Sequence, residues 1–158
     1  MYNESMLIGI KVGSSLLTDN KGVNREYLFN LCRQIADLKR LGHRVFLVTS
    51  GAVASEPNQR MSKNLRAAIG QAKLIGEYRN FFEIFCIKVA QILVNDKDFL
   101  YDSSDRDSSE VVHTLFEVFS YKAVVPVINA NDATSDEELE ALSVCADNDR
   151  LSLMICRT

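Results

Sequence analysis

Four short apolar runs, each separated from the next by a longer amphipathic segment, restrict this chain to few possible folds. The runs are residues 6–12 (MLIGIKV), 44–49 (RVFLVT), 87–94 (IKVAQILV) and 123–128 (AVVPVI). A short, continuous apolar run is typical of a strand that is buried on both faces, and we expect this of residues 6–12 in particular. Strands that alternate with helices predict an α/β fold, a parallel sheet covered by helices on both faces.

The segment between the first two runs carries the clearest helix signals. Asn24 is placed to cap a helix, and Gly42 is placed to end it. The apolar residues recur on one helical face, which predicts that this face packs on the sheet. They are Leu28, Leu31, Cys32, Ile35 and Leu38.

Two further helices are expected before the third and fourth runs. Ser62 opens the longer one, whose expected buried residues are Leu65, Ile69, Ala72, Ile75, Phe82 and Phe85. The shorter one has an apolar face of Val111, Val112, Leu115 and Phe119.

Composition excludes several classes of function. The 158 residues suffice for one domain, and 47% hydrophobic content supports a core. A net charge of -3 argues against binding to nucleic acid or to an anionic membrane. With no run of 18 uncharged apolar residues and no secretion signal, we expect a soluble cytoplasmic protein. The four cysteines form no CxxC pair, and we expect buried thiols and no metal site.

Polar residues follow the first two runs, where a parallel sheet gathers its ligands. Lys11 lies within the first run, so its charge needs a partner or an anion. Gly13, Ser14 and Ser15 come next and can hold phosphate oxygens, although this string taken alone favours an ordinary strand-end turn.

The second run is followed at once by Ser50, Gly51 and Ala52, small residues that leave room for a substrate. The Ser50 hydroxyl can donate to a carboxylate. A glycine-containing turn is the alternative interpretation of this loop.

Amides and carboxylates follow the fourth run. Asn129, Asn131 and Asp132 come directly after it, and residues 147–149 lie further on. Asp132 can accept from the ammonium group of an amino acid, while Asn129, Asn131 and Asn148 can donate to its carboxylates. Loop solvation is the alternative, and Asp147 can instead cap a last helix.

Taken together, these motifs resemble the glutamate 5-kinase branch of the amino-acid kinase family. The matching segments are KVGSSLLT (11–18), VTSGAVA (48–54), AAIGQAKLI (67–75), PVINANDA (126–133) and DNDRLS (147–152). The resemblance implies an α/β/α sandwich and ATP-dependent phosphorylation of the L-glutamate side-chain carboxylate, the first step toward proline. It also implies Mg²⁺ on ATP and assembly as a homo-oligomer.

The resemblance also implies a role for each matching residue. Lys11 contacts the transferring phosphoryl group, and Gly13, Ser14 and Ser15 hold phosphate oxygens. The implied glutamate-binding residues are Ser50, Gly51, Ala52, Asn129, Asn131, Asp132, Asp147, Asn148 and Asp149. The acceptor carboxylate is already ionised at neutral pH, so the reaction needs positioning and charge neutralisation and no general base.

The sequence departs from the family in several places. The loop at residues 54–59 is shorter and lacks glycine, while Ala130 and Ala146 replace a usual Glu and Gly. All seven glycines lie at or before Gly76, so residues 77–158 hold no glycine-rich phosphate loop.

We therefore expect residues 1–158 to be the N-terminal, acceptor-binding half of the kinase domain, with the C-terminal half missing. The chain alone is then expected to bind glutamate weakly and not to transfer phosphate. The alternative hypotheses are an inactive glutamate-binding module or pairing subunit, and an interaction protein that has lost the ligand.

Overall fold

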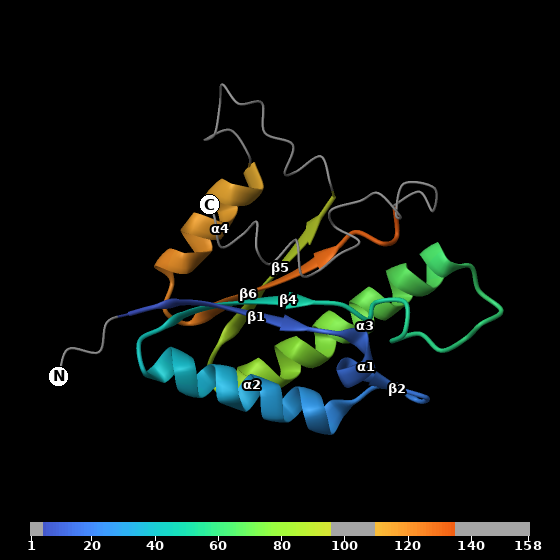
Figure 1. The fold of residues 1–158 in the computed structure, drawn as a ribbon, viewed down its shortest axis with the longest axis horizontal. Coiled ribbons are helices and arrows are strands. Elements are labelled where there is room, and N and C mark those ends of the chain that lie inside the picture. The colour runs from blue at the N-terminus through green and yellow to red at the C-terminus, as the bar shows by residue number, and fades with distance from the viewer. Residues whose placement is uncertain (1–4, 96–109, 135–158) are drawn as a thin grey trace.

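A computed structural model describes residues 5–95 and 110–134 of the chain. They form a parallel sheet with strand order β1-β4-β6-β5 and helices on both of its faces, which confirms the predicted α/β fold (Figure 1). The elements in chain order are β1 (Leu7–Val12), α1 (Ser14–Leu17), β2 (Thr18–Asp19), β3 (Gly22–Val23), α2 (Arg25–Arg40), β4 (Arg44–Thr49), α3 (Lys63–Ile84), β5 (Lys88–Val94), α4 (Glu110–Ser120) and β6 (Val124–Ala130).

The strand register brings the ends of the strands to one edge of the sheet. Val12 of β1 pairs with Thr49 of β4, and Val94 of β5 pairs with Ala130 of β6. Each of these four residues is the last of its strand. The loops that follow β1, β4 and β6 therefore leave the sheet on the same side, as the sequence predicted.

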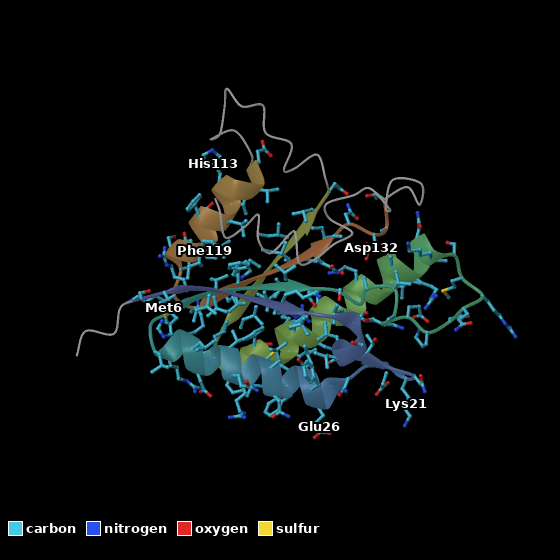
Figure 2. The ribbon with its side chains drawn as sticks, viewed as in Figure 1. Met6, Lys21, Glu26, His113, Phe119 and Asp132 are labelled. Atoms are coloured by element: carbon cyan, nitrogen blue, oxygen red, sulfur yellow. The ribbon has the colours of Figure 1, made fainter. Side chains whose placement is uncertain are left out.

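The two central strands divide the core between the two faces of the sheet. Alternate residues of β4 and β6 point to opposite faces, so Leu47 and Val127 pack with α2 and α3. Phe46 and Ile128 face the other way and pack with α4. Figure 1 shows α2 and α3 on one side of the sheet and α4 on the other, and Figure 2 shows Phe119 on the side of α4 nearer the sheet.

The expected full burial of the first strand is wrong. Residues of β1 alternate between exposed and half-buried up to Val12, and Leu7 is 40% exposed. The reason is strand order, because β1 pairs only with β4 among the described strands, while α4 packs over β5 and β6. An apolar run does not encode which strand lies at the edge.

The predicted ends of α2 and the predicted start of α3 are confirmed. Asn24 Oδ1 accepts from the Tyr27 N–H at 3.1 Å, and Ser62 Oγ accepts from the Leu65 N–H at 3.3 Å. Gly42 follows α2 with a φ of 91°, a left-handed conformation that glycine adopts without steric cost. Leu28, Cys32 and Ile35 of α2 are buried as expected, whereas Leu31 and Leu38 are only partly buried. Ala36, which was not expected, is buried as well.

The expected buried face of α3 is wrong over its first half. Leu65 is 48% exposed and Ala72 is exposed, whereas the buried residues are Ala67, Gly70, Leu74, Tyr78, Phe81 and Phe82. Large apolar residues suggested the wrong face because this half of the helix packs against a loop backbone. Only small residues fit there.

The cysteines of the described segments differ in burial. Cys32 of α2 is buried as expected, and burial raises the pKa of its thiol to about 12. Cys86 is exposed in the turn between α3 and β5, where it adopts a φ of 58°. The expectation of buried thiols therefore fails for Cys86, because a tight turn places it at the surface.

Candidate functional site

A small cleft lies at the edge of the sheet where the strands end. Its volume is about 100 Å³, and it lies between the first half of α3, the loop after β4 and the ends of β5 and β6. The lining residues are Ala52, Ala67, Ala68, Gln71, Leu93, Ala130, Asn131, Asp132 and Ala133. Alanines form most of the wall, and the polar side chains are Gln71, Asn131 and Asp132.

The turn after β6 places two of the predicted site residues in this cleft. The Asn131 N–H donates to the Val94 carbonyl at 2.9 Å, and the Thr134 N–H donates to the Asn131 carbonyl at 3.1 Å. These bonds fix the turn against the end of β5. Figure 2 shows Asp132 just beyond the end of β6, on the side of the molecule where α3 begins. Asn131 and Asp132 are both half-buried.

Asn129, also predicted to bind substrate, lies behind the wall of the cleft. It is 1% exposed, and its Oδ1 accepts from the Ala130 N–H at 2.9 Å. Its Nδ2 donates to Gln71 Oε1 at 2.8 Å. Gln71 therefore stands between Asn129 and the cleft. In the sequence, Gln71 belongs to the family-matching segment 67–75, but nothing there assigns it a role.

The loop after β4 brings the predicted Ser50, Gly51 and Ala52 to the same edge. Ser50 Oγ donates to the Val12 carbonyl at 3.2 Å, which ties the ends of β4 and β1 together. Gly51 has a φ of 95°, and a Cβ built on it would lie 3.5 Å from the Ser14 Cα. Of these three residues, Ala52 lines the cleft.

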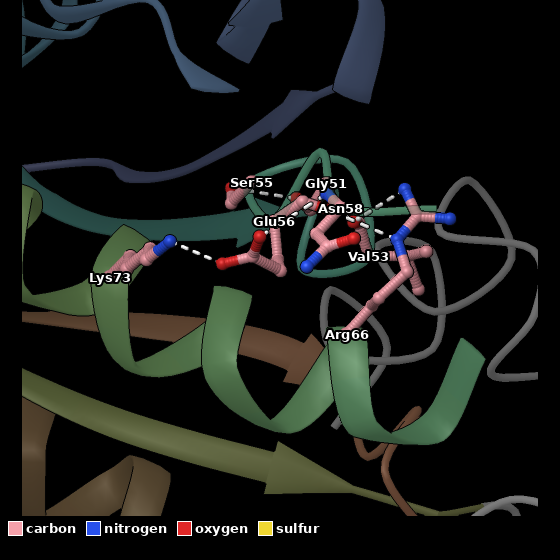
Figure 3. A network of polar contacts seen from close by, with 7 residues as sticks. All are labelled: Gly51, Val53, Ser55, Glu56, Asn58, Arg66 and Lys73. Atoms are coloured by element: carbon pink, nitrogen blue, oxygen red, sulfur yellow. Dashed lines mark hydrogen bonds and ion pairs between the residues drawn. The ribbon is translucent and has the colours of Figure 1, made fainter. Parts of the chain in front are cut away.

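Side chains of α3 hold this loop in place, as Figure 3 shows. Arg66 Nε donates to the Glu56 carbonyl at 2.8 Å, and an Arg66 Nη donates to the Val53 carbonyl at 3.2 Å. Lys73 Nζ forms an ion pair with Glu56 Oε2. The Ser55 hydroxyl donates back to the Gly51 carbonyl at 2.8 Å. The loop is thus bound to α3 at two positions that lie about two turns apart.

The Glu56 carboxylate is the centre of this network. Its hydrogen bond from Lys73, with a second from the Asn58 N–H, holds the pKa of Glu56 below its usual value. Sequence reasoning missed Glu56, Arg66 and Lys73, because charged residues in a loop and on a helix are by themselves typical of a solvated surface.

The first predicted phosphate loop lies at the same edge but does not line the cleft. Lys11 is exposed near the end of β1. Gly13 has an extended backbone with a φ of −77°, and a Cβ built on it would meet nothing within 4 Å. Ser14 and Ser15 are exposed in α1. Gly13 is therefore not required by the packing of the described chain, and the space beside it is open.

Residues 147–149, which the sequence assigns to the acceptor site, lie outside the described residues. Within residues 5–95 and 110–134, no group of three or more His, Cys, Asp or Glu side chains is placed to hold a metal ion. None of the helices in these same segments is long and apolar enough to cross a membrane.

This geometry suits a small ligand with polar ends and a short apolar middle. The alanine walls can contact methylene groups, while Asp132 can accept from a cation and the amides of Gln71 and Asn131 can donate or accept. The loops after β1 and β4 lie at the same edge of the sheet, where parallel sheets commonly bind their ligands.

Comparison with known proteins shows which family the sequence matches, and the match covers most of the chain. Residues 6–157 match the model of the amino acid kinase family. A glutamate 5-kinase of Vibrio campbellii is 32% identical over 98% of this chain, and one of Wolinella succinogenes is 39% identical over 92%. The chain spans 41% and 57%, respectively, of the length of these two relatives. A glutamate 5-kinase of Photorhabdus laumondii is 35% identical, and the chain spans 42% of it.

Proposed function

Because the chain belongs to the amino acid kinase family, we propose that the cleft beside α3 is its amino-acid acceptor site and that the acceptor is L-glutamate. The proposed reaction is ATP-dependent phosphorylation of the glutamate side-chain carboxylate. The observation that carries the proposal is the cleft itself, which joins Asn131 and Asp132 after β6 to Ala52 after β4. The similarity to three glutamate 5-kinases supports the choice of glutamate.

In this proposal each end of glutamate has a partner of suitable chemistry. Asp132 accepts from the ammonium group, and Asn131 donates to a carboxylate oxygen. Ser50 and Gly51 border the acceptor from the β4 loop, with Asn129 behind the wall. Residues 147–149 complete the site from the matching DND motif. The alanines pack against the two methylene groups of the ligand.

Phosphoryl transfer is assigned to the loop after β1. Lys11 neutralises charge on the transferring phosphoryl group, while Gly13, Ser14 and Ser15 supply backbone and hydroxyl donors to phosphate oxygens. ATP would carry Mg²⁺, which offsets the charge on the nucleotide phosphates. The acceptor is an ionised carboxylate, so the site needs no general base.

We further propose that residues 1–158 form the acceptor-binding half of the amino acid kinase domain. This division is supported by the 41% to 57% of the relatives' length that the chain spans. A cytoplasmic location, a role in proline biosynthesis and a homo-oligomeric assembly belong to the same proposal.

A second candidate function is glutamate binding without phosphoryl transfer, in an inactive module or a pairing subunit. It is favoured by the distribution of glycine, since all seven glycines lie at or before Gly76. A phosphate-binding loop usually depends on glycine for close approach of the backbone to the phosphates.

An assay of ADP release with L-glutamate and Mg-ATP distinguishes the two candidates. ADP release that requires glutamate and is lost in Lys11→Ala supports the kinase reaction in this chain. Glutamate binding without ADP release supports the binding module. A chain that neither binds glutamate nor releases ADP contradicts both candidates.

A further inference from the structure

A chain of amide hydrogen bonds runs from the end of β6 to the wall of the cleft. The Ala130 N–H donates to Asn129 Oδ1 at 2.9 Å, and Asn129 Nδ2 donates to Gln71 Oε1 at 2.8 Å. Asn129 is 1% exposed, whereas Gln71 is half-buried and lines the cleft. The hydrogen bonds therefore link a buried strand to a side chain that a ligand can reach.

The first of these bonds sets the direction of the second. A backbone N–H can only donate, so Asn129 faces Ala130 with its acceptor Oδ1 and faces Gln71 with Nδ2. Since Nδ2 can only donate, Gln71 meets it with Oε1. The two Nε2 protons of Gln71 are then left over, and among the described residues the structure gives them no acceptor.

The surroundings of Gln71 suggest what those protons would bind. Among the described residues that line the cleft there is no lysine or arginine, and Asp132 supplies the one carboxylate of this described lining. A ligand ammonium group is attracted to Asp132, which leaves a ligand carboxylate to find donors elsewhere. A half-buried amide suits this role, because a hydrogen bond to an ionised acceptor is stronger than one between neutral groups.

We propose that Gln71 is a specificity-determining residue of the acceptor site, where its Nε2 donates to a carboxylate oxygen of the bound amino acid. Asn129 is a positioning residue, which holds the Gln71 amide with its donors toward the cleft. The inference rests on the proposed function, because it takes the cleft as the site of L-glutamate.

Calorimetric titration of L-glutamate into the chain tests the inference with Gln71→Glu. This variant keeps an acceptor for Asn129 Nδ2 but replaces the two ligand donors with a carboxylate oxygen that repels the ligand. We expect glutamate to bind at least about tenfold more weakly than to the parent chain. Gln34→Glu is the matched control, since it makes the same charge change on the exposed face of α2, and its affinity should equal that of the parent.

A second variant tests the positioning role of Asn129. Asn129→Asp keeps the acceptor for the Ala130 N–H but cannot donate to Gln71, so the Gln71 amide should turn its Nε2 toward the new carboxylate. We expect a loss of affinity of about the same size, and no further loss when Asn129→Asp is added to Gln71→Ala, where no amide is left for Asn129 to orient. A purely structural role for Asn129 would instead give losses that add.

Nuclear magnetic resonance gives a readout that does not depend on a variant binding ligand. The Gln71 side-chain amide signal, assigned by its absence from the Gln71→Glu spectrum, should shift when L-glutamate is added to the parent chain, while that of Gln34 stays in place. If the parent binds glutamate but the Gln71 signal is unmoved or Gln71→Glu binds equally well, the inference is overturned and the proposed function stands. If the parent binds no glutamate, both are overturned.

Discussion

The backbone of α3 at Gly70 lies directly against the carbonyl oxygen of Ala52, so closely that a Cβ on Gly70 would stand 1.8 Å from that oxygen. Ala52 lines the cleft, and Gly70 therefore sets how near the β4 loop lies to the helix that carries Gln71. The glycine is required by this contact and not by its backbone conformation, since it lies within a regular helix.

Gly70→Ala should destabilise the chain by about 2 kcal/mol, because the added methyl group must push the Ala52 carbonyl or the helix aside. Urea unfolding followed by circular dichroism measures the change. Gly76→Ala is the control on the same helix, where a Cβ would meet nothing within 4 Å. Because alanine has a better helix propensity than glycine, Gly76→Ala should stabilise the chain by about 0.5–1 kcal/mol. Equal effects of the two substitutions would contradict the close contact at Gly70.

The Glu56–Lys73 ion pair should make stability depend on pH. The pKa of Glu56 is lowered from its usual value of 4.5 in the folded chain, chiefly by the hydrogen bond from Lys73. A lowered pKa means that the charged form is favoured by folding. The stabilisation that the charged Glu56 carboxylate gives to the folded chain is therefore fully present above pH 4.5. It is lost as the pH falls through the lowered pKa of Glu56 in the folded chain.

Melting temperatures of the parent and Glu56→Gln, measured from neutral pH downward, test this dependence. We expect the parent to be more stable at neutral pH and the two curves to converge in acid. Glu83→Gln, at an exposed position of α3, should follow the parent curve throughout. If the difference in melting temperature between the parent and Glu56→Gln stays constant into acid, the charge of the Glu56 carboxylate is not the cause of the parent's greater stability.

Cys32 and Cys86 should differ sharply in reactivity. Burial raises the pKa of Cys32 to about 12, so its thiol stays protonated and inaccessible at mildly alkaline pH. Cys86 is exposed. Brief treatment with iodoacetamide followed by peptide mass mapping should show label on Cys86, and label on Cys32 only after denaturation. Labelling of native Cys32 at the rate of Cys86 would contradict the described packing of α2.

Tyr78 and Thr49 form a buried polar contact beneath the β4 loop. Both residues are 0% exposed, and their hydroxyl oxygens lie 3.1 Å apart. Burial raises the pKa of Tyr78, so its hydroxyl remains neutral and hydrogen-bonded. Tyr78→Phe should cost about 1 kcal/mol of unfolding free energy, because Thr49 loses its buried partner. Tyr121→Phe, at a residue that is 56% exposed, should leave stability within about 0.5 kcal/mol of the parent.

Most of the fold could be predicted because the signals are local. The apolar runs gave the sheet strands, and the caps at Asn24 and Ser62 lie where the helices begin. The short β2–β3 pair was not predicted, since two-residue strands carry no periodicity. Strand order was not predicted either, and so the exposure of β1 was missed.

The candidate site could be predicted only in part, because some of its residues are defined by contacts between parts of the chain that are distant in sequence. Asn131, Asp132 and Ala52 follow strands, and parallel strands bring such residues to one edge. Gln71 and Lys73 lie mid-helix, where nothing local distinguishes them from surface residues. Their roles depend on contacts with Asn129 and Glu56, which are distant in sequence. The small residues Ala67 and Gly70 were the available signal for a helix face that packs closely on another backbone.

Calorimetric titration of L-glutamate into the purified chain and its Asp132→Ala variant tests the central claim most directly. The chain should bind L-glutamate with a stoichiometry near one. Asp132→Ala should lose that binding while its melting curve stays cooperative, because the ammonium group loses its acceptor. An absence of heat from the parent chain, or equal affinity in the parent and Asp132→Ala, would contradict a glutamate site in this cleft.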